Sequence, residues 1–480
     1  MKKINVIFSA SEMSPYAKTG GLADVVSELP KALFRQGNVD VFTVIPKYGF
    51  IDDSRYNLRE IDRPLRFSIS GAPYESRAKY LEFDGGRRAY FIENAGILGR
   101  SGMYGYNDDA YRFAFLARAT MELARLLDFK PDVIHCHDWH AGLIPVYLKT
   151  IYREDPFFRS TATVFTIHNL AYQGIFPKDL LPYLGIGWEE FKYEKLEYWD
   201  NINFMKAGIS YSDVINTVSK QYSMEIQTPE YGETLDGLLR QRSNNLYGII
   251  NGIDYDTWDP ATDKSLIKNY NENSIDNKIE NKLALQKEFG LPQGPQIPVA
   301  GVVTRLSYQK GLDIIVEAAH DMASMGVQLV VLGTGEEYYQ HLFQKLAHDY
   351  SDNVGIRMAF DDTLARQIYA GSDMFLMPSR YEPCGLSQLI SMRYGAVPIV
   401  RRTGGLTDTV AEYVDGKGTG FLFDNPSPWE LVSAIKKAKD VFEDSENWKQ
   451  LVSNCMKSNF SWGKSAEEYM NLYEKAISML

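Results

Sequence analysis

The sequence has few cysteines, and they lie far apart. Cys136, Cys384 and Cys455 are the only three among 480 residues. Three isolated thiols exclude a disulfide framework, and their separation does not fit the spacing of a zinc site. This usage is typical of a protein in a reducing compartment, so we expect a cytoplasmic location.

Long apolar runs are also missing. Nowhere does the chain approach the roughly 18 consecutive apolar residues that a membrane-spanning helix needs. The apolar stretch at residues 4–10 is too short for a signal peptide, and Glu12 follows it directly. We therefore expect no membrane partner and predict that this first apolar stretch is a strand.

An excess of positive charge is lacking as well. The 51 Lys and Arg residues are outnumbered by 62 Asp and Glu residues, which gives a formal net charge of −11. Such a balance argues against a nucleic-acid partner, although a local basic pocket for a small phosphate remains compatible with it. The remaining composition is that of a globular protein, and the length favours two domains.

Short apolar strands alternate with helix-length segments in two successive series, which is the pattern of βαβ units. The first series has strands at 4–9, 39–45, 133–136, 164–167 and 214–218, and the second at 299–303, 328–332, 353–359, 374–377 and 397–400. The predicted fold class is α/β, with two Rossmann-like doubly wound domains that face each other across a cleft. We expect the domains at residues 1–248 and 249–460, followed by a helix at 461–480 that could pack on either domain.

Two local features interrupt these series. Residues 77–93 alternate in polarity around Asp84-Gly85-Gly86, so we predict an antiparallel insertion there. Residues 259–281 are polar and rich in Asn and Lys, and we predict a surface excursion.

The stretch at 377–410 contains two successive strand-to-helix turns. Gly385 precedes one helix, and Thr403-Gly404-Gly405 opens the next. Helix N-termini carry N–H groups without intrahelical partners, and such groups bind anions. With Arg401 and Arg402 beside them, these turns predict an anion-binding cup, and Glu382 adds one carboxylate. A phosphorylated sugar would suit both features.

Three cations, Lys18, Arg305 and Lys310, lie on other strand-to-helix loops. They could balance the charge of a departing diphosphate without a metal, and no Asp-x-Asp motif stands at a strand end as a metal holder. We therefore expect no metal site. The alternative interpretation is that Arg305 and Lys310 are solvated surface charges.

Glu382 and Cys384 each admit two interpretations. Glu382 could bind sugar hydroxyls or stabilise a cationic transition state, but an acid just before a helix also serves as an N-cap. Cys384 could be a nucleophile at a helix N-terminus. A packing role is favoured for the thiol because no partner base is evident.

Polar residues also follow two strands of the first series. His137, Asp138 and His140 could form a metal cluster, or Asp138 and Trp139 could bind a sugar. His168 could be a sugar ligand or a buried structural histidine. Aromatic residues nearby in sequence could stack on a glucan or fill the core; these are Tyr104, Tyr106, Trp139 and Tyr172.

Taken together, these motifs resemble those of bacterial glycogen synthases and plant starch synthases, glucosyltransferases of the GT-B architecture that use ADP-glucose. The resemblance runs through nearly the whole chain. It rests on Lys18-Thr-Gly-Gly-Leu-Ala-Asp-Val, Tyr104-Gly-Tyr-Asn-Asp-Asp-Ala-Tyr-Arg-Phe, His137-Asp-Trp-His, Thr166-Ile-His-Asn-Leu-Ala-Tyr-Gln-Gly, Asn251-Gly-Ile-Asp, Arg305-Leu-x-x-Gln-Lys-Gly, Arg380-Tyr-Glu-Pro-Cys-Gly-Leu and Arg402-Thr-Gly-Gly-Leu.

The resemblance implies transfer of glucose from ADP-glucose to the non-reducing 4-hydroxyl of an α-1,4-glucan, with retention at the anomeric carbon and without a cofactor. It implies catalytic roles for Glu382, Lys310, Arg305, His168 and Lys18. The substrate-binding positions that it implies are Lys18, Gly20, Gly21, Asp138, Asn251, Phe360, Cys384, Gly385, Leu386, Thr403, Gly404 and Gly405. Phe360 stands where the family usually has a tyrosine stacked on adenine, so any contact through a hydroxyl is lost.

Two mechanisms and two rival functions remain open at this point. The acceptor could attack from the face that ADP leaves, or Glu382 could form a covalent intermediate. A glucan phosphorylase would share the architecture but needs pyridoxal phosphate, and a glucan-binding protein would bind without turnover.

Overall fold

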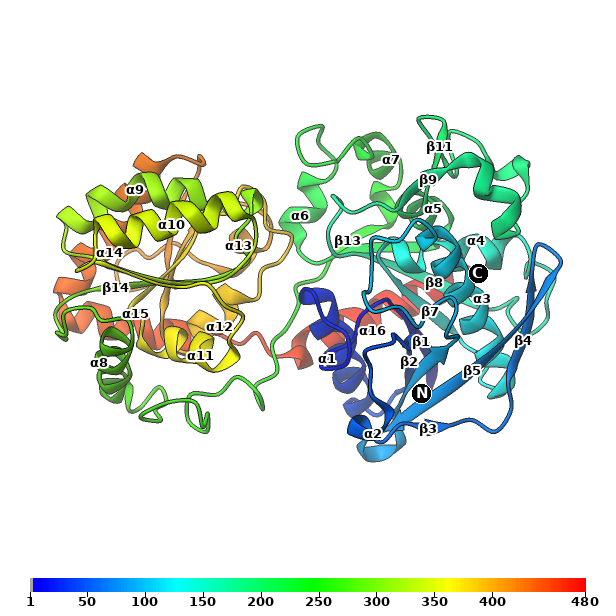
Figure 1. Cartoon of the computed structure of the whole chain (residues 1–480), viewed down its shortest axis with the longest axis horizontal. Coiled ribbons are helices and arrows are strands. Elements are labelled where there is room, and N and C mark those ends of the chain that lie inside the picture. Colours follow the sequence, from blue (N-terminus) through cyan, green and yellow to red (C-terminus); the bar gives the residue numbers. More distant parts are fainter. Residues whose placement is uncertain (1–2) are drawn as a thin grey trace. The chain divides into compact units, whose positions relative to one another are not determined.

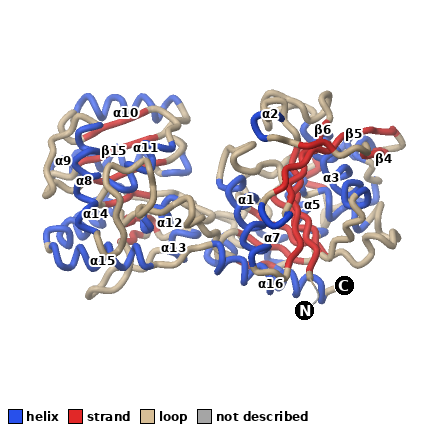
Figure 2. Tube along the Cα trace, turned by 90° about the horizontal axis from the view of Figure 1, so that it is seen from below, coloured by secondary structure: helices blue, strands red, loops and turns tan. Residues whose placement is uncertain are grey.

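The computed structural model describes residues 3–480 and divides the chain into two compact units. Unit 1 comprises the chain up to Val218 together with Ser223–Ile249 and Trp462–Leu480, and unit 2 comprises Ser219–Tyr222 and Ile250–Ser461. In each unit a sheet lies between layers of helices (Figures 1 and 2). The prediction of two α/β domains with parallel sheets is confirmed.

The sheet of unit 1 has a parallel core and an antiparallel edge. Its order is β13-β12-β8-β7-β1-β2-β6-β5-β3, with β4 paired to β5. The strands are β1 (Ile4–Ser9), β2 (Val39–Pro46), β3 (Arg59–Glu60), β4 (Leu65–Ile69), β5 (Ala72–Glu82), β6 (Arg88–Glu93), β7 (Val133–His137), β8 (Ala162–Ile167), β12 (Val214–Thr217) and β13 (Leu246–Gly248). The predicted antiparallel insertion is confirmed by the pairing of β5 with β6. The strand order reverses between β1 and β7, and doubly wound sheets bind ligands at such a switch point.

Helices cover both faces of this sheet, as the continuous apolar character of its strands requires. One face carries α1 (Gly21–Arg35) and the C-terminal helix α16 (Trp462–Ser478). The other carries α3 (Asp109–Leu126), α4 (Leu143–Lys149) and α5 (Phe204–Tyr211). Shorter helices of the first half of the chain are α2 (Asp53–Tyr56), α6 (Lys220–Glu225) and α7 (Asp236–Gln241).

The C-terminal helix α16 is part of the core of unit 1. Trp462, Tyr469 and Tyr473 pack in one apolar cluster with residues of α1 and of the central strands. The two tyrosines also make buried hydrogen bonds. Tyr473 lies 2.8 Å from His135 Nδ1, and Asn216 Nδ2 donates to the Tyr469 hydroxyl at 3.1 Å. The helix is therefore joined to β7 and β12 by polar as well as apolar contacts.

Unit 2 has a six-stranded sheet that is parallel throughout, in the order β16-β15-β14-β17-β18-β19. Its strands are β14 (Val299–Val303), β15 (Gln328–Leu332), β16 (Val354–Arg357), β17 (Met374–Met377), β18 (Val397–Arg401) and β19 (Phe421–Phe423). Here the order reverses between β14 and β17, which makes their carboxyl ends the expected ligand site.

The helices of unit 2 again lie on both faces (Figure 1). One face has α9 (Leu312–Ser324), α10 (Glu337–Asp349) and α14 (Pro428–Glu443), and the other has α8 (Lys278–Glu288), α11 (Asp362–Gly371), α12 (Ser387–Arg393) and α15 (Ser445–Lys457). The short helix α13 (Gly404–Thr409) follows β18. Among residues 3–480, no helix is long and apolar enough to cross a membrane.

The predicted surface excursion at 259–281 is wrong in its middle and at its end. Leu266 and Tyr270 are buried in the core of unit 2, and the Tyr270 hydroxyl donates to the carbonyl of Tyr394 at 2.7 Å. Lys278 begins α8 and is buried, and its ammonium donates to the carbonyl of Ala370 near the end of α11. The prediction from composition failed because Leu266 and Tyr270 are isolated apolar residues in a segment that is otherwise polar.

The sequence also missed a small sheet in unit 1. Its strands are β9 (Ile175–Pro177), β10 (Glu197–Tyr198) and β11 (Asn201–Asn203), in the order β10-β11-β9. Strands of two or three residues are too short to show a periodicity of two.

Candidate active site

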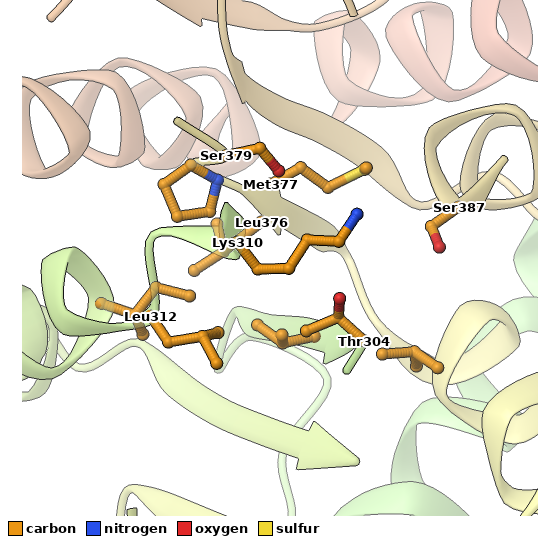
Figure 3. Close-up of a pocket in the computed structure, with 11 residues that line it drawn as sticks. Thr304, Lys310, Leu312, Leu376, Met377, Ser379 and Ser387 are labelled. Atoms are coloured by element: carbon orange, nitrogen blue, oxygen red, sulfur yellow. The ribbon is translucent and has the colours of Figure 1, made fainter. Parts of the chain in front are cut away.

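A pocket lies at the carboxyl ends of β14 and β17, the switch point of unit 2. Lys310 extends across it, with Thr304 on one side and Ser379 and Met377 on the other (Figure 3). The loop between β14 and α9 reaches this position through Gly311, which has φ +64°. A Cβ there would lie 2.1 Å from the carbonyl oxygen of Pro378, so the close approach of the two loops requires glycine.

Lys310 and Glu382 form an ion pair beside this pocket. The Lys310 ammonium lies 2.6 Å from Glu382 Oε2, and the two side chains are 18% and 6% exposed. Ser379 Oγ donates to the same carboxylate oxygen at 2.9 Å. Lys310 is thus not a solvated surface charge, whereas Arg305, just beyond the end of β14, is exposed.

Glu382 is not a helix cap. The N-cap of α12 is Leu386, which makes no side-chain capping bond. The carboxylate of Glu382 instead turns to Lys310 and Ser379, so the N-cap interpretation is wrong. The buried carboxylate of Glu382 is fixed by the ammonium of Lys310 and the hydroxyl of Ser379.

The two glycine turns pack backbone against backbone. Gly405 N donates to the carbonyl of Glu382 at 3.0 Å. A Cβ on Gly404 would lie 2.0 Å from that oxygen, and one on Gly405 would lie 2.1 Å from the carbonyl oxygen of Cys384. The prediction of free amides at the start of α13 is therefore wrong for Gly405, whose N–H already has a carbonyl partner.

The predicted cations beside this cup also have protein partners. Arg401 is buried and donates to the carbonyl oxygens of Asp424 and Arg380. Arg402 Nε lies 2.9 Å from Asp424 Oδ1. Both guanidinium groups hydrogen-bond Asp424, which follows β19, and their place beside a bound anion stays a prediction.

Cys384 is a buried thiol at the centre of these turns. Burial raises its pKa to about 12, so the thiol stays protonated and the nucleophile interpretation fails. Gln388 Nε2 donates to its carbonyl at 2.9 Å, and the backbone of Asn251 hydrogen-bonds its sulfur. Gly385, which follows, has φ +73°. The structure thus brings Asn251 together with Cys384, Gly385 and Leu386 in unit 2.

Phe360 stands apart from that group at the end of β16. Its ring is 82% exposed, while the next residue, Asp361, caps α11 by accepting from Leu364 N at 2.9 Å. The Asp361 cap fixes the backbone next to Phe360, and the phenyl ring is exposed to solvent. A planar ligand could stack on it.

In unit 1, Asp138 and His168 meet at the carboxyl ends of β7 and β8. Asp138 has φ +54°, a strained value for a residue with a Cβ. Its Oδ1 accepts from the backbone N–H of His168 at 2.8 Å, and burial raises its pKa to about 7. His137 Nδ1 lies 3.0 Å from His168 Nε2. Burial lowers the pKa of His168 to about 3, which keeps this imidazole neutral.

His137, Asp138 and His140 do not converge on a metal. The ring of His137 stacks on Phe8, and that of His140 packs among Tyr104, Phe113 and Trp139. No cluster of three or more His, Cys, Asp or Glu ligands occurs in the described part of the chain. Trp139 and Tyr104 are largely packed in this cluster, while Tyr172 is exposed.

The loop that contains Lys18 connects β1 to α1 at the switch point of unit 1. The Lys18 ammonium pairs with Asp24 Oδ1 at 2.7 Å, Gly20 is the N-cap of α1, and Gly21 is its first residue. Sequence reasoning missed Glu12, which hydrogen-bonds this loop, and His137 as the partner of His168. The position of Glu12 after β1 and that of His137 at the end of β7 could have indicated these roles.

Comparison with known proteins agrees with the two-unit α/β fold. A family model described as the starch synthase catalytic domain matches residues 5–241, and one described as glycosyl transferases group 1 matches residues 281–453. A glycogen synthase of Desulforudis audaxviator is 47% identical, with 99% of this chain and 97% of the relative covered. The chain belongs to the glycogen and starch synthase family.

Other members show the same coverage. The glycogen synthase of Thermotoga maritima is 44% identical over 99% of both chains. The solved catalytic domain of starch synthase IV from Arabidopsis thaliana, bound to ADP and acarbose, has a TM-score of 0.92 and 35% identity, covering 99% of this chain and 100% of that one. Sucrose-phosphate synthase from Thermosynechococcus elongatus, at 17% identity and a TM-score of 0.62, shares the fold.

Proposed function

We propose that this member of the glycogen synthase family transfers glucose from ADP-glucose to the non-reducing 4-hydroxyl of an α-1,4-glucan, with retention at the anomeric carbon. The observation that carries the proposal is the largely buried Lys310–Glu382 pair at the switch point of unit 2, in a chain that matches glycogen synthases over 99% of its length. The relative that was solved with ADP and acarbose supports a nucleotide and a glucan as ligand classes.

Unit 2 binds the donor in this proposal. Lys310 and the exposed Arg305 balance the charge of the diphosphate as ADP leaves. Glu382, Asn251, Cys384, Gly385 and Leu386 hold the glucosyl group, and Phe360 stacks on the adenine. Thr403, Gly404 and Gly405 form the adjoining backbone wall.

Unit 1 contributes Lys18 and the backbone of Gly20 and Gly21 to the diphosphate or the acceptor side, and Asp138 and His168 to the sugar. Because its pKa is lowered by burial, His168 acts as a neutral hydrogen-bonding group rather than as an acid. Its backbone carbonyl is a further candidate for contact near the anomeric carbon.

Glu382 serves to bind the sugar rather than to attack it. Its Oε2 is shared between the Lys310 ammonium and the Ser379 hydroxyl, which lowers the nucleophilicity of the carboxylate. The proposed mechanism is therefore a front-face reaction. The acceptor attacks from the side that ADP leaves, and the departing phosphate takes the proton of the 4-hydroxyl.

We further propose a cytoplasmic location and no nucleic-acid or membrane partner. The three cysteines are free and buried, as suits a reducing compartment, and the net charge of −11 opposes binding to polyanions.

The test is ADP release with glycogen or a maltooligosaccharide as acceptor, with ADP-glucose and UDP-glucose compared side by side. Faster turnover with ADP-glucose supports the proposed donor. Equal or faster use of UDP-glucose would contradict the donor assignment, and no turnover with either would contradict the proposed transfer.

A further inference from the structure

Glu12 is a buried carboxylate of unit 1 to which the proposed function gives no role. Glu12 follows β1 at the carboxyl edge of the sheet, beside the reversal of strand order between β1 and β7. Glu12 is only 4% exposed to solvent. A buried carboxylate is costly unless its oxygens are hydrogen-bonded, so its partners indicate what it stabilises.

All described partners of Glu12 are donors. Oε2 accepts from the backbone N–H of Thr19 at 2.6 Å and from that of Gly20 at 3.4 Å. Oε1 accepts from Thr19 Oγ1 at 2.5 Å and from the Tyr104 hydroxyl at 2.7 Å. Four donors on two oxygens match the acceptor capacity of an ionised carboxylate.

Proton counting extends this set by one residue. The Tyr104 hydroxyl also lies 2.7 Å from Ser11 Oγ. Because its single proton goes to Glu12, Ser11 must donate to the phenolic oxygen. Tyr104, which precedes α3, is thereby fixed from both sides.

The loop at 18–20 has little else to hold it. Lys18, Thr19 and Gly20 are exposed, and Gly20 caps α1 in an extended conformation without a side-chain bond. A Cβ on Gly20 would meet nothing within 4 Å. Within the described residues, Glu12 is the only side chain that hydrogen-bonds the backbone of this loop.

We propose that Glu12 is a positioning residue that holds the Lys18-Thr19-Gly20 turn in its binding conformation and joins it to Tyr104. This inference rests on the proposed function, which assigns substrate contacts to Lys18 and Gly20. Glu12 acts through these residues and does not touch the substrate.

Because the loop is exposed, loss of Glu12 should affect kcat more than the stability of the fold. In E12A, water can reach the N–H groups of Thr19 and Gly20, so the fold survives while the turn becomes mobile. A shift of about 1 Å in a substrate-positioning group costs about 100-fold in rate. We expect that fall in kcat for E12A.

E12Q separates geometry from charge. Its amide oxygen can accept from the two backbone N–H groups, and its NH₂ group can face the hydroxyls of Thr19 and Tyr104, which rotate to accept. We expect E12Q to stay within about tenfold of the wild-type kcat.

Asp213 provides a matched control. Its Oδ2 accepts from both the backbone N–H and the hydroxyl of Thr163 at 2.8 Å, the same pairing that Glu12 makes with Thr19. It lies at the opposite, amino edge of the sheet, before β12. D213A should lower the melting temperature and leave kcat within about threefold of wild type.

A double-mutant cycle with K18A tests whether Glu12 acts through the loop. In the K18A background, E12A should lower kcat by about tenfold or less, because Lys18 is already gone and only the backbone of Gly20 is left for Glu12 to position. A second loss of about 100-fold would show independent action and overturn the proposal. An unchanged kcat in E12A alone would also overturn it.

Hydrogen exchange gives a readout that does not need turnover. Amides of residues 15–25 should exchange faster in E12A and not in D213A. Unchanged exchange in E12A would overturn the proposal even if kcat fell. If the wild type transferred no glucose, the proposed function would fail, while the exchange result would still decide whether Glu12 orders the loop.

Two further variants keep the test decisive if E12A does not fold. Thr19→Val removes the hydroxyl bond to Glu12 and keeps the backbone bond, and Tyr104→Phe removes the phenolic bond. Each should lower kcat about three- to tenfold with Lys18 present and have a smaller effect in K18A, where only the backbone of Gly20 is left to position. Equal losses in both backgrounds would overturn the proposal.

Discussion

The ammonium of Lys310 lies 2.6 Å from the carboxylate of Glu382, although the two residues are 72 positions apart in the chain. One follows β14 and the other follows β17, and these strands are neighbours at the point where the strand order of unit 2 reverses. The pair is largely buried and lies beside a pocket. In the proposed function, this pair supplies a fixed cation for the diphosphate leaving group.

Breaking this pair should cost both stability and activity. In K310M the carboxylate of Glu382 keeps only the Ser379 bond, and an uncompensated buried charge costs about 3 kcal/mol. The free energy of unfolding should fall by that amount and kcat by about 1000-fold, measured by denaturant titration and ADP release.

The Lys282–Asp373 pair is the control for that variant. It joins atoms 2.7 Å apart, has a more deeply buried lysine, and lies at the amino end of β17. Asp373 keeps a bond from Val299 N when Lys282 is replaced. K282M should lose similar stability and retain kcat; a comparable loss of kcat would mean that instability alone explains K310M.

Four histidines of unit 1 should make the protein acid-sensitive. Burial lowers the pKa of His135, His137, His140 and His168, so below pH about 6.5 the unfolded chain binds more protons than the folded one. Stability is then lost as pH falls from about 6.5 toward the folded-state pKa values.

The variant H140F isolates one of these protons. The ring of His140 packs among Tyr104, Phe113 and Trp139, where a phenyl ring can replace it. Between pH 6 and 5, H140F should lose about 1.4 kcal/mol less stability per pH unit than wild type. The free energy of unfolding is measured by denaturant titration at each pH. If it fell equally with pH in H140F and wild type, protonation of His140 would not be a cause of the acid sensitivity.

Phe360 should set the affinity for ADP-glucose. Loss of one stacked base costs about 1–3 kcal/mol, so F360A should raise KM for ADP-glucose about tenfold with little change in kcat. Trp429, which is 76% exposed at the start of α14, is the matched aromatic control. If W429A raised KM as much, a specific stacking role for Phe360 would be ruled out.

The polar contact between α16 and β7 should be worth a measurable part of the stability of unit 1. Y473F removes the partner of His135 Nδ1 in a fully buried place, which costs about 1–3 kcal/mol. The unfolding transition of unit 1 should shift accordingly while that of unit 2 stays in place. A shift confined to unit 2 would refute this assignment of α16.

Four of the buried strands were predictable to the residue, while the other predicted strands differ from the structure by one or more residues at an end. The bounds of β1, β14, β15 and β17 agree with the sequence pattern, because a buried parallel strand needs apolar side chains on both faces. The prediction for 259–281 failed because the residues that anchor this segment to the core, such as Leu266 and Tyr270, are isolated in a polar sequence.

The site was predictable in its residue types but not in its contacts. Motifs named Lys310 and Glu382, yet nothing local in the sequence shows that Gly405 N is bonded to the carbonyl of Glu382. Glu12 was missed because its partner Tyr104 lies 92 positions away. Contacts of this kind depend on strand order, which short motifs do not encode.

The most direct test of the account is glucosyl transfer itself. The wild-type protein, K310M and K282M are each incubated with ADP-[13C]glucose and a maltooligosaccharide, and the products are resolved by NMR. The account predicts chains one glucose longer with a new α-1,4 linkage, one ADP per transfer, wild-type yield for K282M and almost none for K310M. A β linkage, hydrolysis without elongation, or equal yields from K310M and wild type would contradict it.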